Sequence, residues 1–297
     1  MKKIILLLTG YFIIVYQNAY ARDTTGNRSF SNGTTELPGE YALIAGGSKG
    51  IGYALAQALA KRKYNLILIA RHWDSLQAAK TKLESAYAIH VELLVNELSR
   101  EQAADEIAEW CFARNVRLKM LCNVAGYGEK DYLSASLDTL RYMVRLNVES
   151  CMALTLRLLP LLEKNAPSYV LNVASMAGLA PIPSKNMYAA TKSAVIFFSY
   201  ALHYQLKEKN ISVSCLAPGP VFTKQYVIDD TKKRLGWFGM KMAVKPQRVG
   251  EIAIRKTLNK KLLIIPGTLA KLSSVIIRLM PRRMIVAIYN NAEKRKR

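Results

Sequence analysis

Short apolar segments alternate with helical segments along most of this chain, and this alternation limits its fold more than any other feature. The first apolar run, Tyr41–Ala45, leads into a glycine-rich turn and an amphipathic helix. Further strands are expected at about 66–70, 91–95, 118–123, 169–174 and 211–216, and helices at about 53–62, 73–86, 100–113, 137–163 and 188–207. Apolar strands that alternate with helices form a parallel sheet covered on both faces. The sequence therefore predicts one doubly wound α/β domain.

Three glycines, Gly46, Gly50 and Gly52, lie in the turn between the first expected strand and the first helix. Glycines let backbone amides approach a pyrophosphate, and the helix N-terminus behind the turn adds partial positive charge. A merely flexible loop would have a similar composition. The flanking strand and helix favour a dinucleotide-binding turn, with Ser48 and Ile51 contributing to it.

Tyr188 and Lys192 are four residues apart in an expected helix, so their side chains leave the same face. A phenol is a poor proton donor at neutral pH unless a fixed cation stabilises its phenolate. At ~4 Å and an effective dielectric constant of ~20, the two groups interact by roughly 4 kcal/mol. This spacing also occurs in helices where the Tyr packs and the Lys is solvated. Ser175, which ends a strand thirteen residues before Tyr188, favours a catalytic interpretation.

The glycine turn, Ser175 and Tyr188-x-x-x-Lys192 together resemble the short-chain dehydrogenase/reductase family over about residues 38–265. Asn123-Val124-Ala125-Gly126 is similar to the family's Asn-Asn-Ala-Gly, with Val124 in place of one Asn. Pro218-Gly219 matches the family's turn beside the nicotinamide, whereas Ala45 stands where the family usually has Thr.

The resemblance implies a Rossmann-type fold and hydride transfer between a nicotinamide cofactor and a carbonyl or hydroxyl group. Ser175 would hydrogen-bond the reacting oxygen, and Tyr188 would deliver the proton. Lys192 would also hold the nicotinamide ribose, and Asn147 would anchor a water that relays protons to Lys192. The expected cofactor-binding residues are Gly46, Ser48, Lys49, Gly50, Ile51, Gly52, Arg71, Glu97, Leu98, Asn123, Ala125, Gly126, Tyr188, Lys192, Pro218, Gly219, Val221 and Thr223.

Charge near the ribose distinguishes NADP(H) from NAD(H). An enzyme that prefers NAD places a carboxylate at the end of the second strand, whereas a 2′-phosphate requires cations. Here that strand ends in Arg71, and Lys49 lies in the glycine turn. We therefore expect NADP(H), although both cations would also suit a solvated surface. Glu97 lies where the family commonly has Asp near the adenine, and the Leu98 amide would serve that contact.

Substrate specificity is expected to depend on residues 177–187 and on the segment after Gly219. Apolar and Met-rich segments suit acyl chains, sterols or sphingoid bases. The apolar residues of the second segment are Val221, Phe222, Tyr226, Trp237, Phe238, Met240 and Met242. Two alternatives are a catalytically silent Rossmann scaffold and a nucleic-acid binder. The second is disfavoured because the cations are spread over many elements and lack an aromatic stacking platform.

The chain of 297 residues has a formal net charge of +22, so its surface should attract polyanions. Residues 260–297 contain ten basic residues and one acidic residue, a net charge of +9. Three histidines lack carboxylates or thiols at ligand spacing, so no metal site is expected. The four cysteines, Cys111, Cys122, Cys151 and Cys215, have no paired spacing and indicate buried thiols in a reducing compartment.

Both ends of the chain indicate membrane association. Residues 1–21 resemble a signal peptide but also suit a membrane anchor, and 22–38 read as a linker before the 39–265 domain. Residues 266–297 form a basic and apolar extension that suits either a packed helix or a membrane-surface helix. We expect a retained anchor, with export after cleavage near Ala21 as the alternative. A homodimer formed through the helices around Asn147 and Lys192 is also expected from the resemblance.

Overall fold

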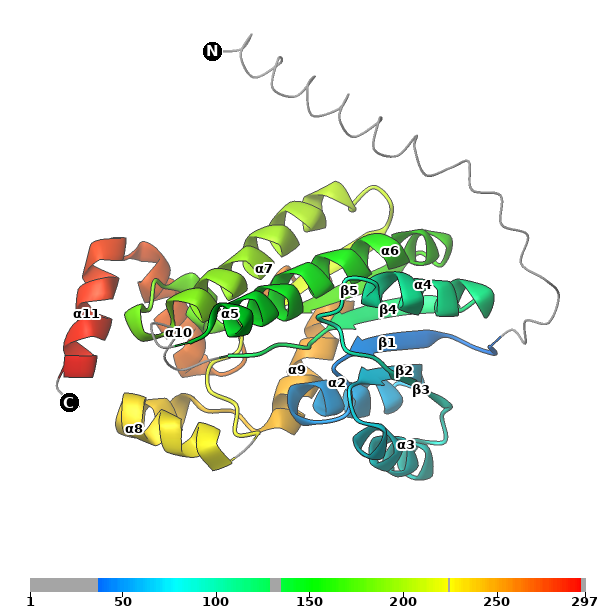
Figure 1. The fold of residues 1–297 in the computed structure, drawn as a ribbon, viewed down its shortest axis with the longest axis horizontal. Helices are drawn as coiled ribbons and strands as arrows, with labels where there is room; N and C mark the ends of the chain where they lie inside the picture. Colours follow the sequence, from blue (N-terminus) through cyan, green and yellow to red (C-terminus); the bar gives the residue numbers. More distant parts are fainter. Residues whose placement is uncertain (1–36, 129–134, 224, 295–297) are drawn as a thin grey trace, which may run out of the picture. The chain divides into compact units, whose positions relative to one another are not determined.

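Seven parallel strands form one sheet in a computed structural model, which describes residues 37–128, 135–223 and 225–294 (Figure 1). Their order is β3-β2-β1-β4-β5-β6-β7. The strands are β1 (Tyr41–Ala45), β2 (Asn65–Ala70), β3 (Val91–Val95), β4 (Leu118–Asn123), β5 (Ser168–Val173), β6 (Ile211–Leu216) and β7 (Leu263–Ile264). The predicted parallel α/β sheet is confirmed. Predictions for residues 1–36 lie outside the described residues.

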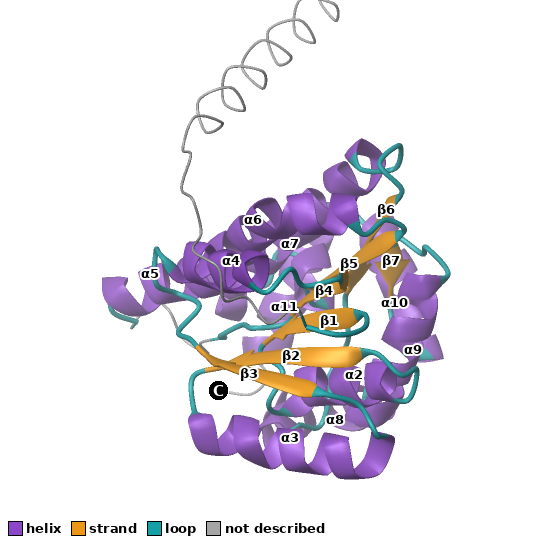
Figure 2. Ribbon diagram, turned by 90° about the vertical axis from the view of Figure 1, so that its right-hand side faces the viewer, coloured by secondary structure: helices purple, strands orange, loops and turns teal. Residues whose placement is uncertain are grey.

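Helices cover both faces of the sheet, as Figure 2 shows. One face packs against α4 (Ala103–Ala113), α6 (Ser150–Lys164) and α7 (Asn186–Gln205). The other packs against α2 (Gly50–Ala60), α3 (Trp73–Tyr87) and α9 (Pro246–Leu258). Strands β1 and β2 are buried on both sides over nearly their whole length, so their sequences are nearly continuous apolar runs rather than alternating ones.

The long helical stretch predicted at 137–163 contains a widened turn. It consists of α5 (Leu137–Val144), a π-helical segment at Arg145–Glu149 and α6. Asn147, the expected fourth catalytic residue, lies inside this π segment. Such segments interrupt the regular hydrogen-bonding pattern and occur frequently at functional sites.

The C-terminal segment belongs to the same compact unit as the sheet, which extends from Glu36 to Arg297. It contains α10 (Thr268–Leu279) and α11 (Arg282–Lys294). Helix α10 packs against α8 (Gln225–Met242) and the 3-10 helix η2 (Met176–Leu179), and α11 contacts the 3-10 helix η3 (Pro183–Lys185). Among the described residues, no helix combines the length and apolar character needed to cross a bilayer.

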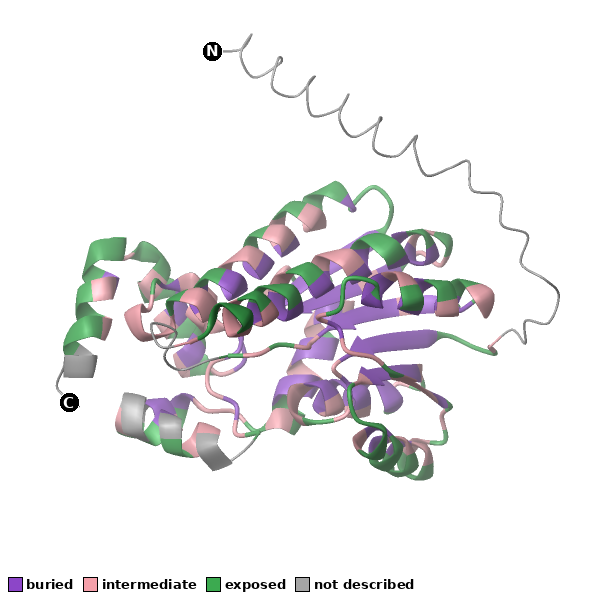
Figure 3. Ribbon diagram, in the orientation of Figure 1, coloured by how far each residue is buried: buried purple, intermediate pink, exposed green. Residues whose placement is uncertain are grey.

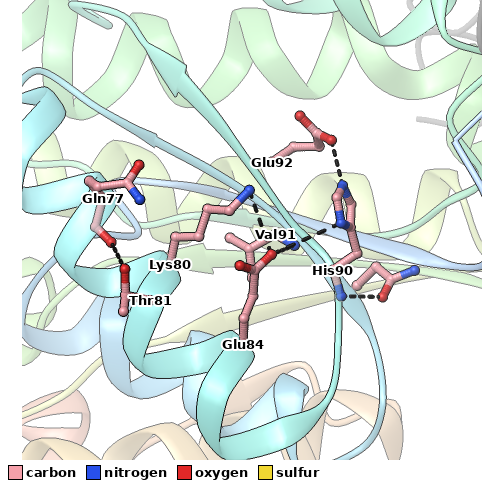
Figure 4. A network of polar contacts seen from close by, with 8 residues as sticks. Gln77, Lys80, Thr81, Glu84, His90, Val91 and Glu92 are labelled. Atoms are coloured by element: carbon pink, nitrogen blue, oxygen red, sulfur yellow. Dashed lines mark hydrogen bonds and ion pairs between the residues drawn. The ribbon is translucent and has the colours of Figure 1, made fainter.

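Polar contacts attach the end of α3 to the start of β3, as Figure 4 shows. Glu84 Oε1 accepts a hydrogen bond from the Val91 amide at 3.0 Å and lies 3.5 Å from Lys80 Nζ. The neighbouring His90 Nε2 lies 2.6 Å from Glu92 Oε1. These contacts hold α3 in place, so that the residues on one of its faces can line a cleft.

Candidate active site

A cleft of about 870 Å³ lies beyond the carboxyl ends of β1 to β4. Its volume falls within the range of small-molecule and cofactor sites, and ligands of open α/β sheets bind at this edge. The predicted cofactor residues that line it are Gly46, Ser48, Lys49, Gly50, Ile51, Gly52, Arg71, Glu97, Leu98, Ala125, Gly126 and Thr223. Residues from five separate parts of the chain therefore converge on one cleft.

The glycine turn at the base of the cleft has no room for larger residues. Gly46 has a φ angle of +95°, in the left-handed region that favours glycine. A Cβ atom on Gly52 would lie 1.9 Å from the Gly46 carbonyl oxygen. Helix α2 thus starts in direct contact with the turn, and its N-terminus faces a cleft that has the backbone needed for a pyrophosphate.

Arg71 is held at the rim of this cleft by two side chains. Its Nη1 lies 2.9 Å from the Tyr142 hydroxyl and 3.6 Å from Glu97 Oε2. The other Glu97 carboxylate oxygen accepts hydrogen bonds from the backbone amide and hydroxyl of Ser99. Glu97 itself lines the cleft, with its carboxylate between Arg71 and Ser99, and its expected position near the adenine stays a prediction.

Lys82 is a lining cation that the sequence did not single out. It is exposed on α3, which also brings Ser75, Ala78 and Ala79 to the cleft. The spacing of these four residues places them on one helical face, and this spacing could have predicted from the sequence that Lys82 faces the cleft. Together with Lys49 and Arg71, Lys82 gives the cleft three basic side chains.

Lys192 is buried beside Tyr188. Its side chain is 4% exposed, and Nζ donates a hydrogen bond to the Val173 carbonyl at 2.9 Å. Nζ lies 5.9 Å from the centroid of the Tyr188 ring. Burial lowers the pKa of Lys192 to about 8, against which nearby thiols act weakly. The expected cation is thus in place and still carries its charge at neutral pH.

Asn147 joins this pair to the loop that follows β4. Its side chain accepts from the Tyr127 amide at 2.7 Å and donates to the Tyr127 carbonyl at 2.8 Å and to Thr191 Oγ1 at 3.0 Å. A Cβ atom on the neighbouring Gly126 would lie 3.1 Å from Lys192 Nζ. Gly126, which lines the cleft, is therefore adjacent to the predicted catalytic Lys192, and the Asn147 amide ties the loop at Tyr127 to α7.

Ser175 follows β5 and caps η2, with its hydroxyl accepting from the Ala177 amide at 3.1 Å. Behind it, Gly178 packs directly on α7, where a Cβ atom would lie 2.6 Å from the Lys192 carbonyl carbon. Pro218 accepts a hydrogen bond from the Met176 amide at 3.0 Å. These contacts hold the Ser175 loop against the turn of α7 that carries Tyr188 and Lys192.

Some predicted residues lie away from the cleft. The Asn123 side chain is buried and donates to Thr155 Oγ1 and Asn172 Oδ1 at 3.0 and 2.9 Å, so it ties β4 to α6 and β5. Val221 is buried and pairs with Val244 in a parallel bridge. Neither side chain is among those that line the cleft.

An apolar wall adjoins the Pro218-Gly219 turn. A Cβ atom on Gly219 would lie 3.5 Å from Met176 Sδ, 3.6 Å from Met242 Cε and 3.8 Å from Ala270 Cβ. Met242 was predicted for the substrate side, whereas Met176 and Ala270 were not. Trp237 was also predicted there but is 71% exposed, with Lys241 Nζ 4.1 Å above its ring. The side chains of Tyr226 and Phe238 lie outside the described residues.

The family model for short chain dehydrogenases matches residues 40–231. The chain therefore belongs to the short-chain dehydrogenase family.

Curated relatives agree with this assignment. The mouse (Mus musculus) very-long-chain 3-oxoacyl-CoA reductase is 31% identical over 191 residues, which span 63% of this chain and 61% of the mouse protein. The chicken (Gallus gallus) hydroxysteroid dehydrogenase-like protein 1 is 31% identical over 190 residues, spanning 63% of this chain and 57% of that protein. The matches thus cover less than two thirds of these relatives.

Solved structures share the fold. A 7beta-hydroxysteroid dehydrogenase structure has a TM-score of 0.77 and 19% identity, covering 85% of this chain and 97% of that chain. An L-sorbose reductase from Gluconobacter frateurii, complexed with NADPH and L-sorbose, has a TM-score of 0.69 and 21% identity, covering 78% of this chain and 97% of that chain.

Proposed function

We propose that this protein is an NADP(H)-dependent oxidoreductase that interconverts a carbonyl and a hydroxyl group on a hydrophobic substrate. The observation that carries the proposal is the junction at Gly126, where a glycine-turn cleft meets buried Lys192 and its neighbour Tyr188. Family membership supports the same reaction class. Intact Ser175, Tyr188 and Lys192 argue against a catalytically silent scaffold.

The glycine turn fits a dinucleotide because Gly46 and Gly52 carry no side chain at two close backbone positions beside the cleft, where the start of α2 can approach a pyrophosphate. When bound, the cofactor supplies or accepts the hydride. Lys49, Arg71 and Lys82 would favour the form that carries a 2′-phosphate, since each is a cation at the cleft. The NADPH bound by the structurally similar sorbose reductase supports this preference.

The chain's own residues handle the proton and the developing charge. In the reductive direction, the Ser175 hydroxyl donates a hydrogen bond to the substrate oxygen, and the Tyr188 hydroxyl transfers its proton to that oxygen. The Lys192 ammonium group stabilises the phenolate that remains. The carbonyl carbon gains a hydride and the oxygen gains a proton, so the product is an alcohol. Asn147 keeps the loop around Gly126 against α7 while this happens.

A hydrophobic substrate is supported by the wall formed by Met176, Met242 and Ala270. Methionine adapts to irregular apolar surfaces. Relatives named very-long-chain 3-oxoacyl-CoA reductases favour an acyl chain within this class. A sterol or sphingoid substrate has similar apolar surface and remains the alternative.

A screen of ketone and alcohol pools tests the proposal. Purified protein is incubated with ketones and NADPH, or with alcohols and NADP+, and converted compounds are identified by mass spectrometry. A series of 3-oxoacyl thioesters of increasing chain length belongs in the pool. We expect conversion that improves with chain length. Absence of conversion in both directions across the pool would contradict an enzymatic role.

The N-terminal segment, Ile4–Ala21, is proposed to remain attached as a membrane anchor, because NADPH and four unpaired thiols suit a reducing compartment.

A homodimer through α6 and α7 is supported by exposed apolar side chains on both helices, Leu156 and Phe197, which are 61% and 69% exposed. Both proposals concern where the enzyme works and in what assembly, not its chemistry.

A further inference from the structure

Helices α10 and α11 together expose six large apolar side chains. On α10, Leu272, Val275, Ile276 and Leu279 are 59%, 45%, 49% and 80% exposed. Their spacing places them on one helical face, while Ala270 and Ser274 on the other face are buried. Helix α11 adds Met284 and Ile288, which are 54% and 55% exposed. We call these six residues the C-terminal apolar stripe.

The stripe is unusual for its density. It holds six of the fifteen large apolar residues that are exposed among the described side chains, all within residues 272–288. Single exposed apolar residues are normal on soluble proteins, but contiguous ones mark an interaction surface. Most of the described residues of α11 are exposed, as Figure 3 shows.

Positive charge surrounds the stripe. Lys271, Arg278, Arg282 and Arg283 are exposed on the same two helices. No Asp or Glu occurs in the sequence between Glu251 and Glu293, although eight Lys or Arg residues do. An apolar stripe flanked by cations, without acids, has the composition of a helix that lies in a membrane interface.

This charge distribution distinguishes between possible partners. A second copy of the chain, paired through the same stripe by a twofold axis, would bring cations against cations. An acidic protein would satisfy the cations but would not by itself cover six apolar side chains. A bilayer with anionic headgroups satisfies both features, because the apolar side chains enter the acyl boundary while the cations meet the headgroups.

The stripe also lies beside the substrate side of the active site. The buried face of α10 packs against η2, which follows Ser175, and places Ala270 at the Gly219 wall. Helix α10 also packs against α8, and Figure 1 shows α10 and α11 at the end of the sheet where the strands finish. We propose that the C-terminal apolar stripe docks on an anionic lipid surface, so that the substrate wall lies next to the bilayer.

A fluorescent label on the stripe tests this contact in the full chain. Leu279→Cys is labelled with an environment-sensitive dye, since the four native thiols are buried and shielded from it. Vesicles contain equal parts of phosphatidylglycerol and phosphatidylcholine, or phosphatidylcholine alone. We expect a blue shift with the anionic vesicles that high salt reduces. The matched label is Leu137→Cys on α5, which is 60% exposed and should show no shift.

Charge reversal provides the second arm. Arg282→Glu with Arg283→Glu should raise the vesicle concentration needed for the shift at the Leu279 label by at least roughly 30-fold, since two interfacial cations are lost and two anions are added. The control, Lys61→Glu with Lys207→Glu, changes net charge equally but leaves the stripe intact. An equal loss in the control would mean that net charge, not the stripe, governs binding.

Three further results would overturn the proposal: no shift at the Leu279 label, an equal shift at Leu137, or a shift that grows with protein concentration without vesicles. The last result would assign the stripe to a second copy of the chain. Labelling at residue 279 reports on the stripe even if residues 1–21 hold the protein on the vesicle. Because the experiment measures no turnover, its failure would leave the proposed enzymatic function untouched.

Discussion

Lys192 is a charged residue of the site whose side chain is almost fully buried. Its ammonium group has the Val173 carbonyl as a hydrogen-bond acceptor, and burial lowers its pKa from 10.5 to about 8. The sequence placed Lys192 on one face with Tyr188, since helical spacing is local. Its burial could not be predicted, because it depends on β5, η2 and the loop at Gly126.

Stability should therefore depend on pH through Lys192. Between pH 8 and 10.5 the unfolded state binds more protons at this lysine than the folded state, so the free energy of unfolding rises with pH across that window. Lys192→Met removes this dependence. Its stabilisation relative to wild type should be greatest below pH 8 and shrink towards pH 10.5. Urea unfolding at several pH values measures the difference in free energy of unfolding between Lys192→Met and wild type. A difference that stays constant with pH would contradict the buried charge.

The cations at the cleft rim make a prediction about the cofactor. Lys49→Ala with Arg71→Ala should weaken NADPH binding far more than NADH binding, because charge-assisted hydrogen bonds to one phosphate contribute ~1.5 to 3 kcal/mol each. Dissociation constants of both cofactors, measured by fluorescence titration, test this. Lys207→Ala with Arg248→Ala is the control away from the cleft. Equal losses for NADPH and NADH would mean that the two cations have another role.

At the scale of elements, the sequence predicted the strands and helices that have a strong local pattern of apolar residues. The bounds of β3, β4 and β6 agree with the expected ranges, because each is a short, mostly apolar segment next to a turn. The widening around Asn147 was not predicted, since a π segment has no apolar period of its own. Equally, nothing local indicates that α10 supplies Ala270 to the wall at Gly219, a contact between residues far apart in the chain.

The contact between η2 and α7 can be broken by one methyl group. In Gly178→Ala the new Cβ atom would lie 2.6 Å from the Lys192 carbonyl carbon, and neither backbone can yield easily. Overpacking of this kind should lower the free energy of unfolding by about 1–3 kcal/mol. Activity should fall further, since η2 carries the Ser175 loop. Thermal unfolding and turnover measure both, with Ala190→Ser on the exposed side of α7 as control; unchanged values would show that the contact is loose.

At the scale of the whole molecule, the net charge of +22 and the proposed N-terminal anchor lead to a prediction about where the protein works. Fractionation of cells with N-terminal sequencing tests the proposed anchor. We expect an intact Met1 in the membrane pellet, partly released by high salt, because basic residues near an anionic surface contribute about 1 kcal/mol each. A chain that begins at Arg22 in a soluble exported fraction would contradict the anchor.

Hydride transfer with Tyr188 as proton donor is the central claim, and isotope labelling tests it most directly. NADPH deuterated at the transferable position is incubated with the best ketone from the screen, and the product alcohol is analysed by mass spectrometry. We predict one deuterium on the former carbonyl carbon. Tyr188→Phe should slow this transfer by ~10²- to 10⁴-fold with NADPH affinity unchanged, whereas Tyr204→Phe should not affect it. Product without deuterium, or wild-type rates in Tyr188→Phe, would contradict the assignment.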